Sequence, residues 1–415
     1  MSDPNIVSHR FDNGLVLVAE AIPTVRSAAF TFLLPAGAAF EPEDRGGAAS
    51  MLAEWITRGA GDLDSRELIG ALDNLGVSHS EGAQTAHTTI SAATLGRNLV
   101  PALSLFADVV RRPTLDDDEV EPIRALAVQS LQGIEDDPGT KVVFELRRRH
   151  YPDPWGRPAV GTIEGVQSAT PDDLRAFHEA TYRPNGAILA VAGAIDWDEL
   201  RKAVGELLDD WRPKPDPRVQ VRPAGPKRDH ILKETQQTQI ALAYPSVTIH
   251  HPDYYLARAA TAILGGYSSA RLFTEVREKR GLCYTVYASY ESHKDRAAVV
   301  GYAGTSTDRA QETLDVTLSE IARLADTGVE EEELETMRAG LKSSLIMQQE
   351  SSMSRSTSLA SDWYHLGRVR PLDEVSAALD ALTPEAVSDF AAKQDVRNFT
   401  LLTLGPTPLR LPPES

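Results

Sequence analysis

Histidine and cysteine, the side chains that most often bind metals or act as general bases, are few and scattered in this 415-residue sequence. No two histidines are four residues apart, the spacing at which two imidazoles share a helix face and can hold one zinc ion. His79 and His87 flank an expected turn and could approach across a hairpin, but two exposed or hydrogen-bonded side chains are the simpler interpretation. The single cysteine, Cys283, excludes a disulfide within the chain and a cage of thiolates. The histidines stand at positions 9, 79, 87, 150, 178, 230, 250, 251, 293 and 365.

A guanidinium and a phenol in the second half of the chain are the next candidates. Arg277 lies in a run of helical spacing over residues 270–280, ARLFTEVREKR, which Gly281 is expected to end. Residues 283–290, CYTVYASY, alternate like a strand and place Tyr284 at its start. Both side chains can stabilise negative charge on a carbonyl oxygen. By composition alone, a helix-surface cation and a half-buried sheet residue are the simpler interpretation.

Residues 46–59, GGAASMLAEWITRG, predict a helix over 46–58 with one apolar face. On its other face Glu54 and Arg58 are four residues apart and are expected to form a surface ion pair. The apolar positions are Ala48, Met51, Leu52, Trp55 and Ile56.

The two halves of the sequence echo each other. Residues 118–125, DEVEPIRA, match 332–339, EELETMRA, at an offset of 214, and both are typical of an acidic first helical turn. Arg183 and Arg397 share that offset, and each precedes a strand-like run. We therefore predict duplicated domains, each closing with a strand.

A proline-rich run over residues 213–228 is the expected linker, because proline lacks an amide proton and restricts the residue before it. We expect domains over 1–212 and 229–415. Strands followed by consecutive helices, rather than strict alternation, favour an α+β layered fold. The serine-rich segment 351–361 is expected to be either a flexible element or a helix with a face of small residues.

Seven segments follow one another along the first half of the chain in an order and spacing that can be compared with known families. They are FDNGLVLVAEAIP, AAFTFLLPAGAAFE, GGAASMLAEWITRG, RELIGALDNLGVSHSE, LSLFADVVRRPTL, PWGRPAVGTIEGV and YRPNGAILAVAGAID. With these segments the sequence resembles, over nearly its whole length, the M16 (pitrilysin-type, inverzincin) peptidase family. That resemblance implies two homologous domains, each a mostly antiparallel sheet packed with helices, the metallopeptidase M16/LuxS-like fold. Active members carry H-x-x-E-H on a helix of the first domain.

The metal-binding motif of the family is degenerate in this chain. Ser50, Ala53 and Glu54 stand where active members have histidine, glutamate and histidine. The third ligand of the family, a glutamate on a later helix, corresponds to Leu131. Glu135, one turn further on, is the alternative, a shifted ligand. A hydroxyl, a methyl group and one carboxylate are a poor zinc site, so the resemblance implies no metal in this chain.

The resemblance also assigns a role to the second half. Members carry an arginine and a tyrosine seven residues apart that bind the substrate backbone and support the oxyanion, and these correspond to Arg277 and Tyr284. Arg280 is a second candidate for the arginine, although it is four residues from the tyrosine.

Together these matches imply a non-catalytic, substrate-binding subunit of a heterodimeric zinc peptidase, whose partner carries H-x-x-E-H and the zinc ion. Peptides are then the substrates. A degenerate homologue that acts as a peptide-binding or assembly scaffold is the alternative from another class, and a peptidase with an unusual site is a third.

Composition limits the other partners. The net charge of −18 repels phosphate backbones, which argues against a nucleic-acid partner. Neither a signal peptide nor an uninterrupted apolar run of membrane-spanning length is visible, so we expect a cytoplasmic protein without a membrane partner.

Overall fold

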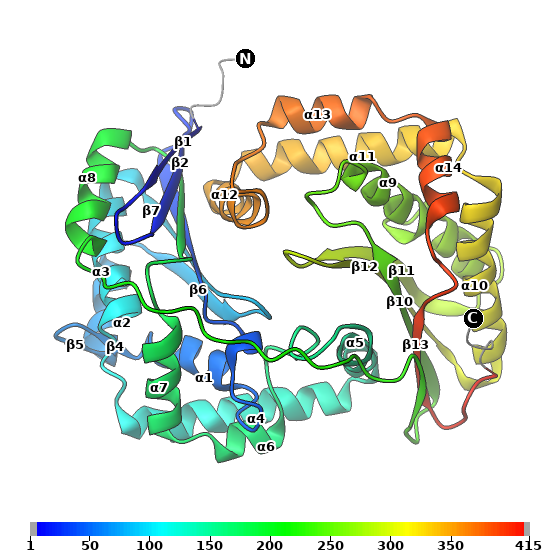
Figure 1. Cartoon of the computed structure of the whole chain (residues 1–415), viewed down its shortest axis with the longest axis horizontal. Helices are drawn as coiled ribbons and strands as arrows, with labels where there is room; N and C mark the ends of the chain where they lie inside the picture. The colour runs from blue at the N-terminus through cyan, green and yellow to red at the C-terminus, as the bar shows by residue number, and fades with distance from the viewer. Residues whose placement is uncertain (1–5, 411–415) are drawn as a thin grey trace. The chain divides into compact units, whose positions relative to one another are not determined.

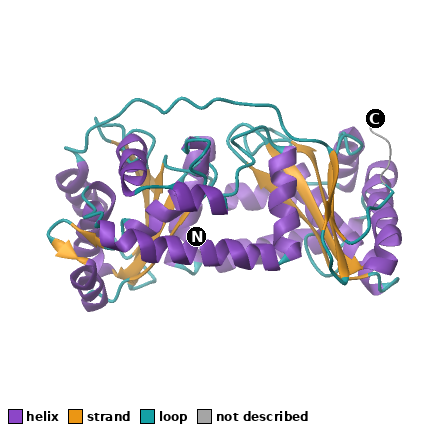
Figure 2. Cartoon of the chain, turned by 90° about the horizontal axis from the view of Figure 1, so that it is seen from below, coloured by secondary structure: helices purple, strands orange, loops and turns teal. Residues whose placement is uncertain are grey.

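The computed structural model of the chain describes residues 6–410, which form two compact units. Unit 1 combines the residues up to Gly133 with Arg157–Val221 and Ile346–Val369. Unit 2 combines Ile134–Gly156 and Arg222–Leu345 with the residues from Arg370 onwards. Each unit has one main β-sheet with helices packed against it, and Figure 2 shows the strands gathered in these sheets.

The sheet of unit 1 has the strand order β1-β2-β8-β3-β7-β6. Neighbouring strands run antiparallel except β2 and β8, which are parallel. The central strands β3 and β8 are nearly continuous apolar runs because both of their faces are covered, whereas the edge strand β6 is polar and largely exposed. The strands are β1 (Ile6–Arg10), β2 (Val16–Ala21), β3 (Ser27–Leu34), β6 (Ser78–Ala83), β7 (Thr88–Leu95) and β8 (Ile188–Gly193).

One face of this sheet carries the main core of unit 1, in which Phe30, Trp55 and Phe106 are buried. Around it lie the small ribbon β4 (Gly59–Ala60) with β5 (Leu63–Asp64) and the short turns η1 (Ala38–Phe40), η2 (Gly96–Asn98) and η3 (Asp117–Glu119). The helices are α1 (Ala48–Trp55), α2 (Ser65–Asn74), α3 (Leu99–Arg111), α4 (Val120–Asp136), α6 (Ile163–Ser168), α7 (Pro171–Thr181) and α8 (Trp197–Leu208).

The other face of the same sheet is covered by α12 (Ser352–Leu366), which comes from the second half of the sequence (Figure 1). Its buried Leu359 and Ala360 pack on β2, β3 and β8. The small hydroxyl side chains of α12 let the helix lie close to the sheet. The hydroxyl oxygens of Ser356 in α12 and Thr31 in β3 are only 3.0 Å apart. Segment 351–361 is therefore a helix with a small-residue face, and the flexible alternative is wrong.

The sheet of unit 2 has the order β11-β12-β10-β13-β9, antiparallel except for the parallel pair β13 and β9. The helices of its main core are α9 (Tyr254–Gly265), α10 (Ala310–Thr327), α11 (Glu331–Gln349), α13 (Leu372–Asp380) and α14 (Pro384–Lys393), with the turns η4 (Phe273–Glu278) and η5 (Thr307–Arg309). The strands are β9 (Arg228–Leu232), β10 (Gln237–Ser246), β11 (Cys283–Ser292), β12 (Ala297–Ser306) and β13 (Thr400–Gly405).

The opposite face of this second sheet is covered by α5 (Pro138–His150), a helix from the first half of the sequence. Val142 and Leu146 of α5 are buried against Ala241 and Leu402 of the sheet. The exchange is therefore reciprocal: each half of the sequence supplies one covering helix to the sheet built mainly from the other half.

The two sheets share one plan, since β2-β8-β3-β7-β6 in unit 1 corresponds to β9-β13-β10-β12-β11 in unit 2. This correspondence confirms the prediction of an α+β fold with two homologous, mostly antiparallel sheets. None of the helices formed by residues 6–410 combines the length and the apolarity needed to cross a lipid bilayer.

Candidate functional site

Helix α1 carries the degenerate motif and is held at its first turn by a buried carboxylate. Glu41 accepts hydrogen bonds from the backbone amides of Gly47 and, at 2.7 Å, Ala49. Gly47 has a φ of 106°, a left-handed conformation that favours glycine. Burial raises the pKa of Glu41 to about 7, although the two amides and the charge of Arg157 act in the opposite direction. The predicted apolar face of the helix is buried, as expected.

The structure brings Ser50, Ala53 and Glu54 together in the wall of one hollow of unit 1. The hollow has a volume of about 200 Å³. Helix α1 forms one side, and the rest is lined by Glu81 and Gly82 of β6 and by Ile123, Leu126 and Ala127 of α4. Leu131 is buried in the main core one turn further along α4 and is not part of that lining.

The donors around this hollow do not fit a zinc ion. Glu54 pairs with Arg58, as predicted. Glu135, the alternative ligand, is not part of the lining and pairs with Lys141. A serine hydroxyl and an alanine methyl group complete the motif. Zinc would therefore meet two carboxylates, Glu54 and Glu81, which are already engaged by Arg58 and His79, where the two imidazoles of the motif are needed. Within residues 6–410 no group of three or more histidine, cysteine, aspartate or glutamate side chains has an arrangement that could hold a metal ion.

The two histidines flanking the β6–β7 turn do not meet. His79 lies opposite Ala92 in the strand pairing and contacts Glu81 at 3.1 Å through Nδ1. This hydrogen bond raises the pKa of His79 above its ordinary value. His87 lies at the far end of the hairpin, where its ring is 5.2 Å from that of Tyr364. The two histidines therefore do not approach each other across the hairpin, in agreement with the simpler interpretation of two separate side chains.

In unit 2, Arg277 lies in an irregular helical turn rather than in the α-helix that the apolar spacing predicts. Residues 273–278 form a π-helical turn, with the amide of Lys279 donating to the carbonyl of Thr274. One extra residue is inserted in such a turn, and the hydrophobic period alone does not reveal it. Gly281, with a φ of 58°, ends the segment as predicted.

Tyr284 stands at a β-bulge at the start of β11, because the pairing with β12 shifts register between Cys283 and Thr285. Bulges re-aim side chains and are over-represented next to active sites. The tyrosine is 80% exposed, which is far more than the half-buried position expected for an ordinary strand residue. Burial raises the pKa of the neighbouring thiol of Cys283 to about 11.

Arg277 and Tyr284 lie together. The guanidinium carbon of Arg277 is 5.2 Å from the ring centroid of Tyr284 and 4.7 Å from that of Phe273. Within the described part of the chain no hydrogen bond or ion pair engages the guanidinium of Arg277, so its donors remain available. Arg280 instead pairs with Glu275 at 2.6 Å, which leaves Arg277 as the stronger candidate of the two.

Two family descriptions match the chain: "Insulinase (Peptidase family M16)" over residues 16–156 and "Peptidase M16 inactive domain" over residues 168–341. The chain belongs to the M16 peptidase family. An uncharacterized zinc protease of Bacillus subtilis is 27% identical to this M16 chain over 397 residues, covering 95% of it and 97% of the relative. One from Mycobacterium leprae is 29% identical over 405 residues, covering 95% and 90%.

Solved structures share the fold of this M16 chain. The crystal structure of a peptidase M16 inactive domain from Pseudomonas fluorescens has a TM-score of 0.87 at 23% identity and covers 98% of this chain and 99% of its own. The crystal structure of a protease from Helicobacter pylori has a TM-score of 0.89 at 20% identity, with coverages of 97% and 100%. At these identities the likeness establishes the two-unit α+β fold.

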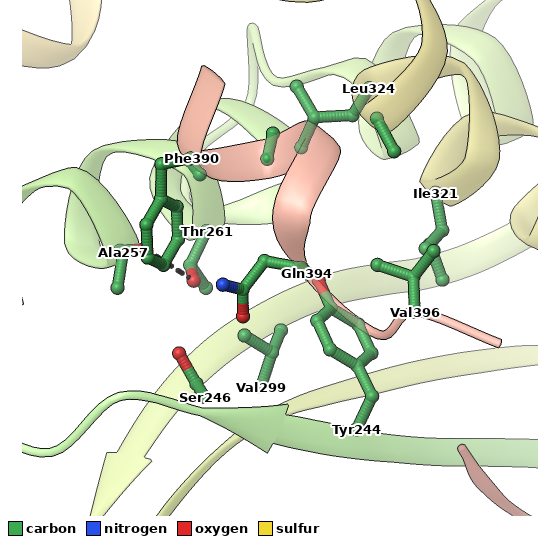
Figure 3. Close-up of a pocket in the computed structure, with 13 residues that line it drawn as sticks. Tyr244, Ser246, Ala257, Thr261, Val299, Ile321, Leu324, Phe390, Gln394 and Val396 are labelled. Carbon is green, nitrogen blue, oxygen red and sulfur yellow. Dashed lines mark hydrogen bonds between the residues drawn. The ribbon is translucent and has the colours of Figure 1, made fainter. Parts of the chain in front are cut away.

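A separate apolar hollow in unit 2 does not belong to the candidate site. It lies between β10 and the helices α9, α10 and α14, with Tyr244, Thr261 and Phe390 in its lining (Figure 3). Its volume of about 20 Å³ is room for about one water molecule. It is therefore a packing defect of the core rather than a ligand site.

The position of the Phe273 ring under the guanidinium of Arg277 was not predicted from the sequence. Phe273 reads as a core residue in the apolar pattern, yet its ring supports the guanidinium. The available signal was the spacing of four residues between Phe273 and Arg277, which places an aromatic ring and a cation on one helical face.

Proposed function

We propose that this M16 chain is the non-catalytic, substrate-binding subunit of a heterodimeric zinc peptidase, in which Arg277 and Tyr284 bind the peptide backbone in the active site of a partner subunit. The partner supplies the H-x-x-E-H helix and the zinc ion. The observation that carries the proposal is the unengaged guanidinium of Arg277 beside the exposed phenol of Tyr284.

The arrangement suits charge that develops on a substrate. A guanidinium without a carboxylate partner keeps its donors for a carbonyl oxygen, and a phenol adds one further donor. Stacking on Phe273 holds the arginine without using any of those donors. Such preorganised donors stabilise an oxyanion without reorganisation during the reaction.

The sheets offer edges for an extended peptide. Among the described strands, the outer strands of the two main sheets pair on one side only; these are β1 and β6 in unit 1 and β9 and β11 in unit 2. A peptide can add to such an edge through backbone hydrogen bonds, which reads the main chain more than the side chains. Tyr284, at the start of β11, would then lie beside the backbone of a peptide bound to that strand.

The hollow beside α1 supports the non-catalytic part of the proposal. Neither the hydroxyl of Ser50 nor the methyl group of Ala53 can replace a ligand or a general base, and Glu54 is held by Arg58. The chemistry of zinc activation, a metal-bound water and a carboxylate base, has no donor set here.

The test combines elemental analysis with a peptidase assay. Purified chain is dialysed against trace-metal-free buffer, its zinc content is measured, and cleavage of a fluorogenic peptide library is followed with and without an H-x-x-E-H chain of similar length. We expect less than about 0.1 zinc per chain, no cleavage by the chain alone, and cleavage by the mixture that exceeds that of the partner alone.

One tightly held zinc per chain, with cleavage that a chelator stops and added zinc restores, would overturn the proposal. A mixture that forms a stable complex but gains no activity would support the scaffold alternative instead.

A further inference from the structure

We propose that Arg271 is a positioning residue that fixes the direction of Arg277 through a buried ion pair with Glu333. Arg271 touches neither Arg277 nor Tyr284 in any contact of the described residues, so its effect is exerted through the turn that follows it. The inference rests on the proposed function for the role of Arg277, but its structural part can be tested without a partner.

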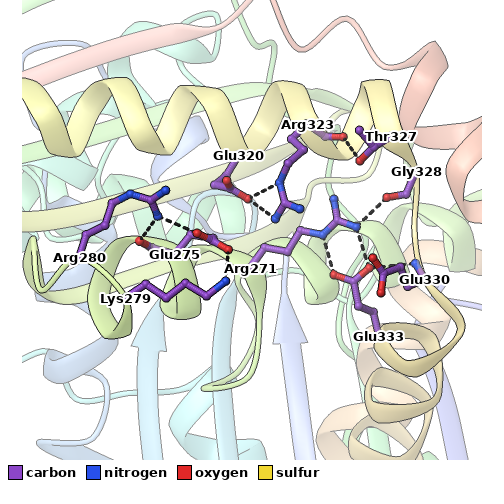
Figure 4. A network of polar contacts seen from close by, with 10 residues as sticks. All are labelled: Arg271, Glu275, Lys279, Arg280, Glu320, Arg323, Thr327, Gly328, Glu330 and Glu333. Carbon is purple, nitrogen blue, oxygen red and sulfur yellow. Dashed lines mark hydrogen bonds and ion pairs between the residues drawn. The ribbon is translucent and has the colours of Figure 1, made fainter.

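The ion pair joins the start of the turn to another helix (Figure 4). Arg271 is 6% exposed, and its Nε and Nη2 each donate to one oxygen of the Glu333 carboxylate at 2.6 Å. Nη2 also donates to the carbonyl of Gly328 at 2.6 Å. Glu333 itself accepts from the amide of Glu330 at 2.9 Å. These bonds fix the guanidinium of Arg271, whose backbone lies two residues before Phe273.

Stability alone does not explain this ion pair. Two charges that leave water lose hydration that their attraction often fails to recover, so a buried pair can be replaced by apolar side chains at little cost. Nη1 of Arg271 is buried without a hydrogen-bond partner among the described residues, and such an unsatisfied donor destabilises the fold. What a planar, two-pronged contact supplies is a fixed geometry.

The far end of the turn is held as well. Arg309 donates to the carbonyls of Gly281 at 2.8 Å and Arg280 at 2.9 Å. The hydroxyl of Thr305 donates to the carbonyl of Leu282 at 2.6 Å. Arg277 thus lies in a segment that is anchored at both ends, while its own guanidinium makes ring contacts but no hydrogen bond within the described residues.

The direction of Arg277 depends on the π turn between these anchors. An α-helix advances roughly 100° per residue, so relaxation of the inserted residue would rotate Arg277 by about that angle around the helix axis. It would then leave the ring of Tyr284. The buried fork of Arg271 opposes this relaxation because it fixes where the segment begins.

The chain contains a natural reporter of this segment. Cys283, the single cysteine, lies directly before Tyr284, is half-buried, and has a thiol whose burial raises its pKa to about 11. Its labelling by a thiol reagent at pH 8 should be slow in the natural chain. We expect the double variant Arg271→Met/Glu333→Leu, which leaves neither charge unpaired, to label at least about tenfold faster.

The neighbouring pair Arg323 and Glu320 provides a matched control. The Glu320 carboxylate is buried and accepts from Nε of Arg323 at 2.9 Å, but the pair lies within α10 and makes no hydrogen bond to the turn (Figure 4). Arg323→Met/Glu320→Leu should leave Cys283 labelling within about twofold of the natural rate. Thermal unfolding of all variants separates local opening from global destabilisation.

A second measurement connects the turn to activity. In the mixture of this chain with an H-x-x-E-H partner, called the restored peptidase below, Arg271→Met/Glu333→Leu should lower kcat about tenfold with less than a threefold change in KM. The conservative variant Arg271→Lys should show a similar loss of kcat, because an ammonium group lacks the planar fork of a guanidinium. Added to Arg277→Ala, the double substitution should cause no further loss, since both act through one side chain.

The outcomes decide between the two proposals. Unchanged Cys283 labelling in a folded Arg271→Met/Glu333→Leu chain overturns the positioning role, whatever the peptidase does. Faster labelling with an additive loss on top of Arg277→Ala overturns it as well. Faster labelling together with an inert Arg277→Ala substitution would support the anchoring of the turn and overturn the proposed function.

Discussion

Arg355 of α12 donates through Nε to the carboxylate of Glu20 in β2, and both side chains are buried although 335 residues separate them in the sequence. This ion pair fastens the helix contributed by the second half of the chain to the sheet of unit 1. Because the pair is buried, removal of one partner leaves the other charge without compensation.

We therefore expect Arg355→Ala to lower the free energy of unfolding by about 3–5 kcal/mol. Urea denaturation followed by tryptophan fluorescence measures the change. Replacement of both side chains, Arg355→Met with Glu20→Met, should recover most of the loss. A single variant within about 1 kcal/mol of the natural chain would show that the pair contributes little.

Substitutions at Arg277 and Tyr284 should separate activity from stability. Tyr284 is exposed and Arg277 makes only ring contacts, so Arg277→Ala and Tyr284→Phe should each change the free energy of unfolding by less than about 1 kcal/mol. In the restored peptidase we expect kcat/KM to fall roughly 10²–10³-fold for Arg277→Ala, the cost of one oxyanion donor.

Arg280→Ala is the matched control, because its guanidinium already pairs with Glu275. It should reduce kcat/KM less than threefold. Equal losses for the two arginines would contradict the assignment of Arg277.

Stability should depend on pH through Glu41. Burial raises its pKa in the folded chain from 4.5 to about 7. Between these values the folded chain binds a proton that the unfolded chain does not, so this group stabilises the fold below pH 4.5 and loses that contribution as the pH rises through 7. The full difference amounts to about 3 kcal/mol.

The measurement compares urea denaturation of the natural chain and Glu41→Gln from pH 5 to pH 8. Since glutamine does not titrate, the natural chain should lose stability relative to the variant as the pH rises. A constant difference between the two proteins across this range would refute the role of Glu41.

Two glycines in helices should respond oppositely to alanine. A Cβ on Gly265 of α9 would lie 2.4 Å from the backbone nitrogen of Ala288 in β11, whereas one on Gly340 of α11 meets nothing within 4 Å. We expect Gly265→Ala to destabilise the chain by more than about 2 kcal/mol and Gly340→Ala to stabilise it by about 0.5–1 kcal/mol. Thermal unfolding of both variants checks this, and a harmless Gly265→Ala would contradict the close packing of α9 on β11.

Local patterns predicted much of the fold. The spacing in residues 46–58 identified the buried face of α1, including Met51 and Trp55, and Gly281 marked the end of the turn before β11. The repeated offset of 214 residues indicated the duplication that the matching strand orders now confirm. These features depend on neighbouring residues or on a copy of the same segment, both of which a sequence displays.

The rest depends on contacts that a sequence does not display. The serine-rich segment 351–361 left open a flexible element or a helix with a face of small residues, and it did not show which sheet such a helix covers, because Thr31 and Ser356 are far apart in the chain. The exposure of Tyr284 arises from one inserted residue in a strand pair, and the alternation of residues 283–290 is blind to it. The π turn at residues 273–278 was not predicted either, because it also contains one inserted residue that the hydrophobic period does not reveal.

Because α12 from the second half of the sequence covers the sheet of unit 1, and α5 from the first half covers the sheet of unit 2, neither half of the gene encodes a complete domain. A fragment ending in the proline-rich run would expose the apolar side of its sheet, including Val18, Leu33 and Ile188, and would precipitate or bind chaperones. When this fragment is co-produced with residues 229–415, α12 should again cover the exposed face of its sheet. The two fragments should then form one soluble complex that elutes from a size-exclusion column at the position of the intact chain.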